Sequence, residues 1–393
     1  MLRRAKNILV LNQVSHINYP VYFCDDLFNL QHKASTYLSK LCEGKMVMVV
    51  IDKNVNKIYG RRIRNLFDSI KTRYSVHELR ISERSKSIET AQGLCARAKH
   101  LGLRRDSILI VIGGGIVMDI VGFAAFMYRK KIPYIRIPTT LVGVVDAGVG
   151  VKVGVNFNGS KNFIGGYYPP LAVFNDQQFL KTLPIKEVRC GLFEILKMAI
   201  IADRKLFDRI KDYYNLFLTR EFNSRTHAIN YSAAFLMMEE LEKNLFEADL
   251  QRLVDFGHTF SPFLETASNF SIPHGEAVGM DMLISSYISC KRRLITRLEF
   301  EEIFLVTKMV GFSKKHTLPG SKVLHASLHE IRKHRAGNLN LVLPAQIGSA
   351  IFTNNCSLRE VARANAFLLS TGLFSEIQPH HMKQKKGRSK QSV

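Results

Sequence analysis

In the N-terminal half, the chain reads Ser107-Ile-Leu-Ile-Val-Ile112 and continues directly into Gly113-Gly-Gly115. A short apolar run that ends in glycines predicts a buried strand followed by a tight turn. Helical periodicity follows as far as Met127, and a further apolar segment, Tyr134-Ile-Arg-Ile137, ends at Pro138. Strand, glycine turn, helix, strand is the order typical of a parallel sheet with crossover helices. The predicted fold class is therefore α/β.

Upstream segments continue the same pattern. Met46-Val-Met-Val-Val-Ile51 is another apolar run, closed by Asp52, and residues 88–103 have helical periodicity. Both fit further elements of the same parallel sheet and its crossover helices.

The character of the chain changes near Pro184, where strand signals nearly disappear. Amphipathic helical patterns dominate from there, at residues 187–201, 226–247, 260–267 and 275–293. One late strand is predicted at 340–343, before a proline. The expected units are 1–183, 184–378 and a basic disordered tail at 379–393.

The composition is that of a globular protein. Of the 393 residues, 46% are apolar and 23% charged, which excludes collagen-like, coiled-coil and wholly disordered chains. No apolar run reaches the roughly 18 residues of a membrane span. The six cysteines are scattered without a close pair, which disfavours a disulfide framework. Because no signal-peptide core follows the basic N-terminus, we predict a cytoplasmic protein with no membrane partner.

The chain is also strongly basic. It has 56 Lys and Arg against 33 Asp and Glu, a formal net charge of +23 that suits an anionic partner. This charge is spread along the chain and its C-terminal tail, and no RNA-binding aromatic motif, zinc finger or basic zipper occurs. A generally basic surface is the better interpretation, so no nucleic-acid partner is predicted.

The glycine turn is a candidate nucleotide site. Backbone amides of Gly113–Gly115 at a helix N-terminus can face a pyrophosphate. The third glycine of a dinucleotide-binding fingerprint is replaced by Met118, so a purely structural turn is an equal alternative. Asp52 favours the nucleotide because a carboxylate at a strand end can bind ribose hydroxyls.

A second candidate lies between Asp146 and Asn156, a segment rich in glycine and valine that also carries Lys152. Glycines let a ligand approach the backbone closely, while Lys152, Lys161 and Asn162 could bind a phosphate. The alternative is a glycine-rich hairpin with solvated lysines.

The third candidate is chemically the most specific. Glu194 and Lys197 are three residues apart in an apolar helical pattern, so both project from one face. Burial of a carboxylate there is costly without a partner or a metal. His258 and His274 could complete a zinc site of two histidines and one glutamate. Satisfied core histidines are the alternative.

In their order along the chain, these segments resemble the sugar phosphate cyclase family, the group that contains 3-dehydroquinate synthase. The resemblance spans roughly residues 45–345. It rests on Glu83-Arg-Ser-Lys86, Gly113-Gly-Gly-Ile-Val-Met-Asp119, Pro138-Thr-Thr-Leu141, Asp146 to Lys152, Lys161-Asn162, Thr182-Leu-Pro184, Glu194-Ile-Leu-Lys197, Gly257-His-Thr259 and His274-Gly-Glu276.

The resemblance implies an N-terminal Rossmann-like domain, a mainly helical C-terminal domain and an active site between them. It also implies one NAD, one zinc (or cobalt) ion and a homodimer. The residues implied to surround NAD are Asp52, Asn54, Glu83, Lys86, Gly114, Gly115, Asp119, Thr139, Thr140, Lys161 and Thr182. The metal would be held by Glu194, His258 and His274, and the substrate would meet Asp146, Lys152, Asn162, Lys197 and Asp255.

The chemistry that the resemblance implies is a redox-neutral cyclisation of a phosphorylated sugar. A ring hydroxyl is transiently oxidised, phosphate leaves by β-elimination, the ketone is reduced again, and an intramolecular aldol step closes a carbocycle. NAD is regenerated in each turnover.

Departures from the 3-dehydroquinate synthase pattern indicate a subgroup. Asp255 stands where those enzymes have Asn, Pro262 replaces a histidine, Met237 a lysine and Gln251 an arginine. Loss of cationic groups fits a substrate without a carboxylate, and these segments look like those of the 2-epi-5-epi-valiolone synthases, which cyclise sedoheptulose 7-phosphate. Lys130 replaces an arginine that is usual in the family, which keeps the charge but loses the bidentate fork.

Three other functions remain open at this point. The chain could be a 3-dehydroquinate synthase. It could also be a metal- and NAD-dependent alcohol or glycerol dehydrogenase, which would release NADH. From another class, it could be an inactive, basic binding protein on the cyclase scaffold, which would retain neither NAD nor metal.

Overall fold

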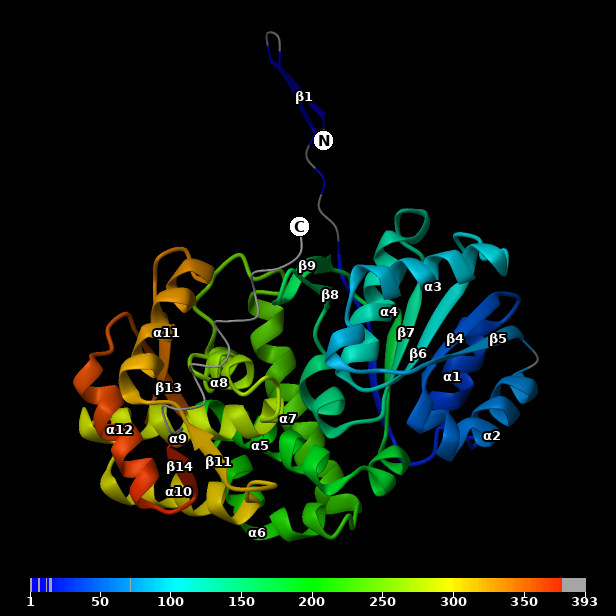
Figure 1. The fold of residues 1–393 in the computed structure, drawn as a ribbon. Helices are drawn as coiled ribbons and strands as arrows, with labels where there is room; N and C mark the ends of the chain where they lie inside the picture. The colour runs from blue at the N-terminus through cyan, green and yellow to red at the C-terminus, as the bar shows by residue number, and fades with distance from the viewer. Residues whose placement is uncertain (1, 6–7, 12, 14–15, 71, 377–393) are drawn as a thin grey trace, which may run out of the picture.

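The computed structural model describes residues 2–5, 8–11, 13, 16–70 and 72–376. The tail expected at 379–393 therefore lies outside the described residues. The described chain forms two adjoining parts, a parallel sheet flanked by helices and a mainly helical part (Figure 1). A short antiparallel strand pair, β1 (Leu2–Ala5) and β2 (Ile8–Leu11), stands off the rest of the molecule.

Six parallel strands form the N-terminal sheet in the order β3-β10-β7-β6-β4-β5. They are β3 (Val21–Cys24), β4 (Met46–Asp52), β5 (Arg73–Leu79), β6 (Ile108–Gly113), β7 (Tyr134–Pro138) and β10 (Ala172–Asp176). The expected strands at 46–51, 107–112 and 134–137 correspond to β4, β6 and β7. A parallel sheet requires crossover connections, so the predicted α/β class is confirmed.

Helices cover both faces of this sheet. Alternate residues of β4 point to opposite faces, which is why the strand is apolar throughout. Val47, Val49 and Ile51 pack with α1 (Lys33–Cys42) and α2 (Lys53–Ile70). Met48 and Val50 pack on the other face with α3 (Ile88–His100) and α4 (Gly115–Met127).

An antiparallel hairpin, β8 (Lys152–Phe157) and β9 (Ser160–Tyr167), follows a π-helical turn at Gly143–Ala147. The hairpin that was the alternative interpretation of the glycine-rich segment is therefore present. It packs against α4 and leads the chain back to β10, so the segment with Asp146 and Lys152 lies between the two parts of the molecule.

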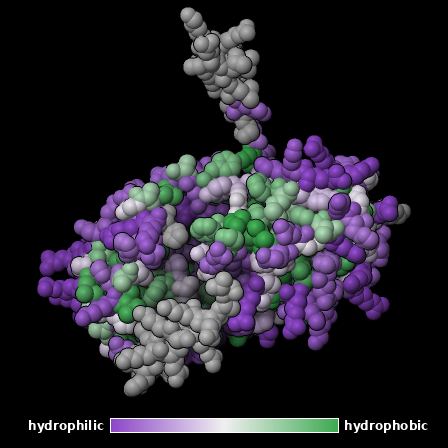
Figure 2. Space-filling model, turned by 45° about the horizontal axis from the view of Figure 1, so that its top comes forward, coloured by the Kyte–Doolittle hydropathy of each residue, from purple (hydrophilic) through white to green (hydrophobic). Residues whose placement is uncertain are grey.

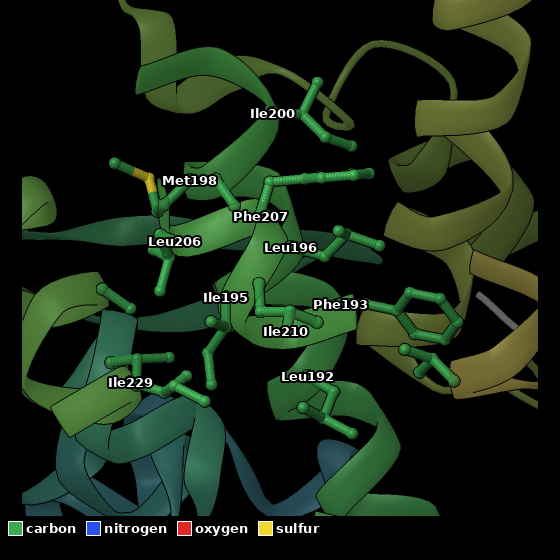
Figure 3. Packing of buried hydrophobic residues seen from close by; sticks show 14 of the residues in the cluster. Leu192, Phe193, Ile195, Leu196, Met198, Ile200, Leu206, Phe207, Ile210 and Ile229 are labelled. Atoms are coloured by element: carbon green, nitrogen blue, oxygen red, sulfur yellow. The ribbon is translucent and has the colours of Figure 1, made fainter. Parts of the chain in front are cut away.

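The C-terminal part is built around α5 (Ile185–Ala202), which is buried along most of its length. Figure 3 shows Leu192, Ile195 and Leu196 of α5 close to side chains of the following helix. The other helices are α6 (Arg204–Leu218), α7 (Ser224–Lys243), α8 (Ser261–Ala267), α9 (His274–Lys291), α10 (Arg297–Val310), α11 (Ser321–His334) and α12 (Leu358–Ser370). None of the described helices is long and apolar enough to cross a membrane.

Two small strand pairs complete this part. They are β11 (His316–Leu318) with β14 (Phe374–Glu376), and β12 (Leu341–Gln346) with β13 (Ser349–Thr353). The expected late strand at 340–343 is β12, but it continues through Pro344. A register shift between Pro344 and Gln346 accommodates the proline, which has no N–H for the ladder.

Candidate active site

The centre of the candidate site is the crossing of α5 and α9. A Cβ added to Gly275 would lie 2.3 Å from the backbone of Cys190, and one added to Gly279 would lie 2.7 Å from the Phe193 ring. The two helices therefore approach more closely than any larger residue would allow. This contact places the first residue of α9, His274, beside Glu194 in the middle of α5.

Glu194, His258 and His274 lie together. One potential ligand atom from each lies within 4.8 Å of the other two. His274 Nε2 is 3.1 Å from Glu194 Oε1, and His258 Nε2 is 4.0 Å from the same oxygen. The predicted triad therefore converges, from a helix, a loop and a helix N-terminus.

A second layer of contacts orients the two imidazoles. His274 Nδ1 lies 2.9 Å from Glu265 Oε1, and His258 Nδ1 lies 3.1 Å from the Phe256 carbonyl oxygen. If each Nδ1–H donates to its oxygen, each Nε2 lone pair points toward Glu194. Sequence reasoning did not identify Glu265. It lies on α8, nine residues before His274, with no motif to mark it.

The chemistry of this donor set fits a divalent metal. Glu194 is 1% exposed, its Oε1 faces both imidazoles, and its Oε2 lies 2.7 Å from the Lys197 ammonium. A buried carboxylate of this kind is costly unless a cation compensates it. Two imidazoles and one carboxylate are a common zinc set, and they leave a coordination position for a substrate oxygen.

Lys197 joins this triad to Asp146. Its ammonium lies 2.7 Å from Glu194 Oε2 and 3.4 Å from Asp146 Oδ2, and the residue is 1% exposed. Burial alone would lower the pKa of Lys197, but Asp146 and Glu194 raise it above its usual value. Lys197 is therefore a fixed cation and a hydrogen-bond donor.

The electrostatics of the carboxylates follow from the same contacts. Burial would raise the pKa of Glu194, but Lys197 and the two histidines hold it well below its ordinary value. Burial would likewise raise the pKa of Glu265, yet His274 and Lys161 lower it to about 2. Both carboxylates are therefore ionised at neutral pH.

A chain of ion pairs occupies the neighbouring corner of the site. Asp255 Oδ1 lies 2.5 Å from Arg252 NH2, and Asp255 Oδ2 lies 3.2 Å from Arg335 NH2. Glu247 pairs with both Arg252 and Lys152. Lys152 and Asp255, both predicted substrate residues, thus belong to one network. Sequence reasoning missed Glu247, and only the folded structure shows that Arg335 pairs with Asp255.

Asn162, the remaining predicted substrate residue, and the positions that depart from the family pattern differ in exposure. Asn162 is exposed on β9, with φ 50°, and its backbone N–H donates to Asn156 Oδ1 at 2.9 Å. Lys130 is exposed, with φ 63°. Met237 is 4% exposed and packs in the hydrophobic core around α5, whereas Gln251 and Pro262 are exposed.

Several predicted NAD residues meet at the carboxyl ends of three neighbouring strands. Asp52 ends β4 and accepts hydrogen bonds from the backbone N–H groups of Asn54 and Val55, at 2.7 and 3.2 Å. Gly114 is the N-cap of α4, directly after β6, and a Cβ there would lie 2.9 Å from Thr140 Cγ2. The predicted residues Gly115, Thr139 and Thr140 lie in the same strand-end turns. Nucleotides bind at such strand ends in open α/β sheets.

The other predicted NAD residues are held by specific pairs. The Lys86 ammonium lies 2.5 Å from Asp119 Oδ2, and Glu83 Oε1 accepts a hydrogen bond from Asn156 Nδ2 at 2.8 Å. Lys161 Nζ is 2.7 Å from Glu265 Oε2 and 3.9 Å from Glu83 Oε1, so it links the hairpin to the metal-ligand layer. The hydroxyl of Thr182 lies 3.0 Å from that of Tyr59 on α2.

Comparison with known proteins gives consistent matches. Residues 76–190 match the family model described as 3-dehydroquinate synthase N-terminal, and residues 191–333 match 3-dehydroquinate synthase C-terminal. The 2-epi-5-epi-valiolone synthase of Streptomyces albus is 41% identical over 324 residues, which cover 80% of this chain and 79% of that protein. The enzyme of the same name from Streptomyces glaucescens is 41% identical over 314 residues, 79% of this chain and 80% of that protein.

A solved structure agrees with these relatives. The 2-epi-5-epi-valiolone synthase of Streptomyces hygroscopicus subsp. jinggangensis, with NAD+ and Zn2+ bound, matches with a TM-score of 0.87 and 34% identity. The match covers 92% of this chain and 99% of that one, so it includes both the sheet and the helical part.

Proposed function

The chain belongs to the 3-dehydroquinate synthase family, and from this premise we propose that it is a sugar phosphate cyclase that converts sedoheptulose 7-phosphate to 2-epi-5-epi-valiolone with release of phosphate. Because the carbon–oxygen bond to phosphate is broken by elimination, the enzyme would be a carbon–oxygen lyase. NAD and zinc, which are bound in the solved relative, would be its cofactors.

The observation that carries the substrate choice is the pairing of Asp255. Both of its oxygens are engaged by arginines, Arg252 and Arg335, and Arg252 is also paired with Glu247. These acids compensate much of the charge of the two guanidinium groups, which disfavours binding of a substrate carboxylate beside them. Asp255 itself would repel a carboxylate, since like charges are unfavourable in a partly desolvated site, but it can accept hydrogen bonds from sugar hydroxyls.

Glu194, His258 and His274 would hold the metal, with Glu265 fixing the orientation of His274. When bound, the metal would supply a Lewis acid for a substrate oxygen, and NAD would accept a hydride and return it. Gly114, with the strand ends beside it, would receive the pyrophosphate of NAD.

Lys197 would donate a hydrogen bond to the substrate, and Asp146 would accept a proton from it. The Lys197 ammonium, held by two carboxylates, would donate a hydrogen bond to the oxygen that becomes a ketone and stabilise negative charge there. The Asp146 side chain is 29% exposed and faces that ammonium, so it can accept a hydroxyl proton while remaining accessible to substrate.

A side-by-side phosphate-release assay tests the proposal. Purified protein with NAD and zinc should release phosphate from sedoheptulose 7-phosphate, and the carboxylated seven-carbon precursor of dehydroquinate should be turned over poorly. A preference for the carboxylated substrate would make this chain a 3-dehydroquinate synthase. The homodimer, the cytoplasmic location and the boundary near residue 183 stay predictions.

A further inference from the structure

Arg136 is a buried cation that the proposed chemistry does not use. It lies on β7, is 0% exposed, and is the largest fully buried side chain in the part of the chain that the structure describes. Across the described ranges, no carboxylate lies within 4.0 Å of its guanidinium. A buried charge needs compensation, so its contacts must be found elsewhere.

Those contacts are all backbone carbonyls of one short segment. Arg136 NH1 donates to the carbonyl oxygens of Ala147 and Gly148, at 3.3 and 3.2 Å, and to that of Gly150 at a shorter distance. Arg136 NH2 donates to the carbonyl oxygen of Lys152 at 3.0 Å. Four partial negative charges therefore surround a single guanidinium.

Tyr19 contacts the one carbonyl group of residues 147–150 that Arg136 does not reach, that of Val149. Its hydroxyl donates to the Val149 oxygen at 2.7 Å. Every carbonyl from Ala147 to Gly150 thus faces one of two side chains, which come from different parts of the sequence. The segment is also compact, because a Cβ at Gly148 would lie 2.2 Å from the Gly143 oxygen and no larger residue fits there.

We infer that Arg136, assisted by Tyr19, is the positioning residue that fixes the backbone of residues 146–152 and thereby aligns the catalytic side chains at its two ends. One end is Asp146, which faces Lys197 at 3.4 Å, and the other is Lys152, which pairs with Glu247. The inference rests on the proposed function for the roles of those side chains, and on the contacts above for the geometry.

A planar guanidinium suits this task better than an ammonium. It presents five N–H donors in a fixed fork, so one side chain can hold several carbonyls of a curved segment at once. Lysine would keep the charge but would lose the fork. The conservative variant should therefore restore only part of the function.

The first test needs no substrate. Hydrogen–deuterium exchange of the backbone amides at 143–152 should rise by about tenfold in Arg136→Met, with less change in Arg136→Lys, because removing the bonds lowers the local opening free energy. NAD affinity, measured by calorimetry, should stay within about twofold of the parent value because the strand-end turns are not altered. Arg104→Met, at an exposed arginine, is the matched control.

The second test is kinetic. Since an error of about 1 Å in a catalytic group can cost on the order of 100-fold, kcat/KM of Arg136→Met should fall by up to that factor, with Arg136→Lys intermediate. In an Asp146→Asn background the Arg136→Met change should cost far less than it does alone, since coupled residues are not additive. Full additivity, or unchanged exchange at 143–152, would overturn the inference.

If Arg136→Met does not fold, Tyr19→Phe keeps the buried cation and removes a single hydroxyl. It should raise exchange near Gly150 and lower kcat/KM by a smaller factor. No change in either quantity would contradict the inference. If the parent protein releases no phosphate from sedoheptulose 7-phosphate while the exchange results hold, the proposed function fails and the positioning role of Arg136 stands.

Discussion

His274 lies between two carboxylates, and this arrangement determines how it can bind a metal. Its Nε2 is 3.1 Å from Glu194 and its Nδ1 is 2.9 Å from Glu265. A carboxylate on Nδ1–H fixes both the ring orientation and the tautomer of a metal-binding histidine. Glu265 is in turn paired with Lys161 at 2.7 Å, so the layer behind the metal ligands is itself held in place.

The first prediction concerns Glu265→Gln. Without the negative charge behind His274, the affinity for zinc should fall by roughly 10–100-fold. Zinc retained during dialysis against a competing chelator measures the effect. Glu360→Gln, which alters a glutamate paired with Arg292 away from the site, is the control. Equal zinc retention in folded Glu265→Gln and the parent protein would show that Glu265 has no role in metal binding.

The second prediction concerns Asp255→Asn. The substitution leaves Arg252 and Arg335 without their shared carboxylate, so the corner gains positive charge. Turnover of sedoheptulose 7-phosphate should decrease, while inhibition by the carboxylated precursor of dehydroquinate should become stronger. Steady-state kinetics gives kcat/KM for sedoheptulose 7-phosphate and the inhibition constant of the carboxylated precursor, and the ratio of these two constants is the measurement. A variant that keeps the parent ratio would remove Asp255 from the specificity argument.

At this scale the sequence predicts ligands better than their partners. The Glu194, His258 and His274 triad could be proposed from residue type, helical spacing and family resemblance, and the three residues do converge. The partners of the site residues could not be proposed from the sequence, because acidic residues and arginines are common. Only tertiary contacts distinguish Glu265, Glu247 and Arg335 from the others. The ion pair between Arg335 and Asp255 is visible only in the folded structure.

At the scale of elements, the crossing of α5 and α9 controls the site. Gly275 and Gly279 on α9 let the helix approach Cys190 and Phe193 of α5. Glu194 and His274 come from these two helices, so a change in their separation moves one metal ligand relative to another. Helix packing and metal geometry are therefore coupled here.

The third prediction is that Gly275→Ala destabilises the fold and weakens zinc binding together. The new Cβ would lie 2.3 Å from Cys190 backbone atoms, and overpacking of this kind costs about 1–3 kcal/mol. Thermal unfolding and zinc retention measure the two effects. The control is Gly93→Ala in α3, where a Cβ meets nothing within 4 Å and about 0.5–1 kcal/mol of stabilisation is expected. Equal stability of the two variants would contradict the close-contact argument.

The long helices α5 and α9 could be predicted from their periodicity, whereas strands of three residues could not. The helical patterns at 187–201 and 275–293 correspond to α5 and α9 within two residues at each end. The strands β11 and β14 are three residues each, too short to display a period. The π-helical turn at 143–147 lies against α7 and α5, and no local pattern contains these contacts.

At the scale of the whole molecule, the candidate site lies where the sheet part and the helical part meet. The strand ends of β4, β6 and β7 supply several of the predicted NAD residues, and α5 and α9 supply two of the three predicted metal ligands (Figure 1). The surface around these elements is rich in hydrophilic side chains, with apolar residues gathered near the centre of the face in Figure 2. The net charge of +23 acts over this whole surface.

The fourth prediction follows from that charge. A sugar phosphate carries negative charge at neutral pH, so the basic protein should attract it at long range. Raising the salt concentration should lower kcat/KM and leave kcat nearly unchanged, since the Debye length shrinks from ~10 Å at 0.1 M to ~3 Å at 1 M. Steady-state kinetics in a series of salt concentrations provides the test, and an unchanged kcat/KM would show that the net charge does not steer the substrate.

We propose that NAD is reduced and reoxidised within one turnover of a cyclisation. Simultaneous recording of phosphate release and NADH absorbance, with sedoheptulose 7-phosphate, zinc and limiting NAD, tests it most directly. We predict many equivalents of phosphate per NAD, no net accumulation of NADH, and 2-epi-5-epi-valiolone as the product. NADH formed in proportion to substrate consumed, without phosphate, would contradict the account and make the chain a dehydrogenase.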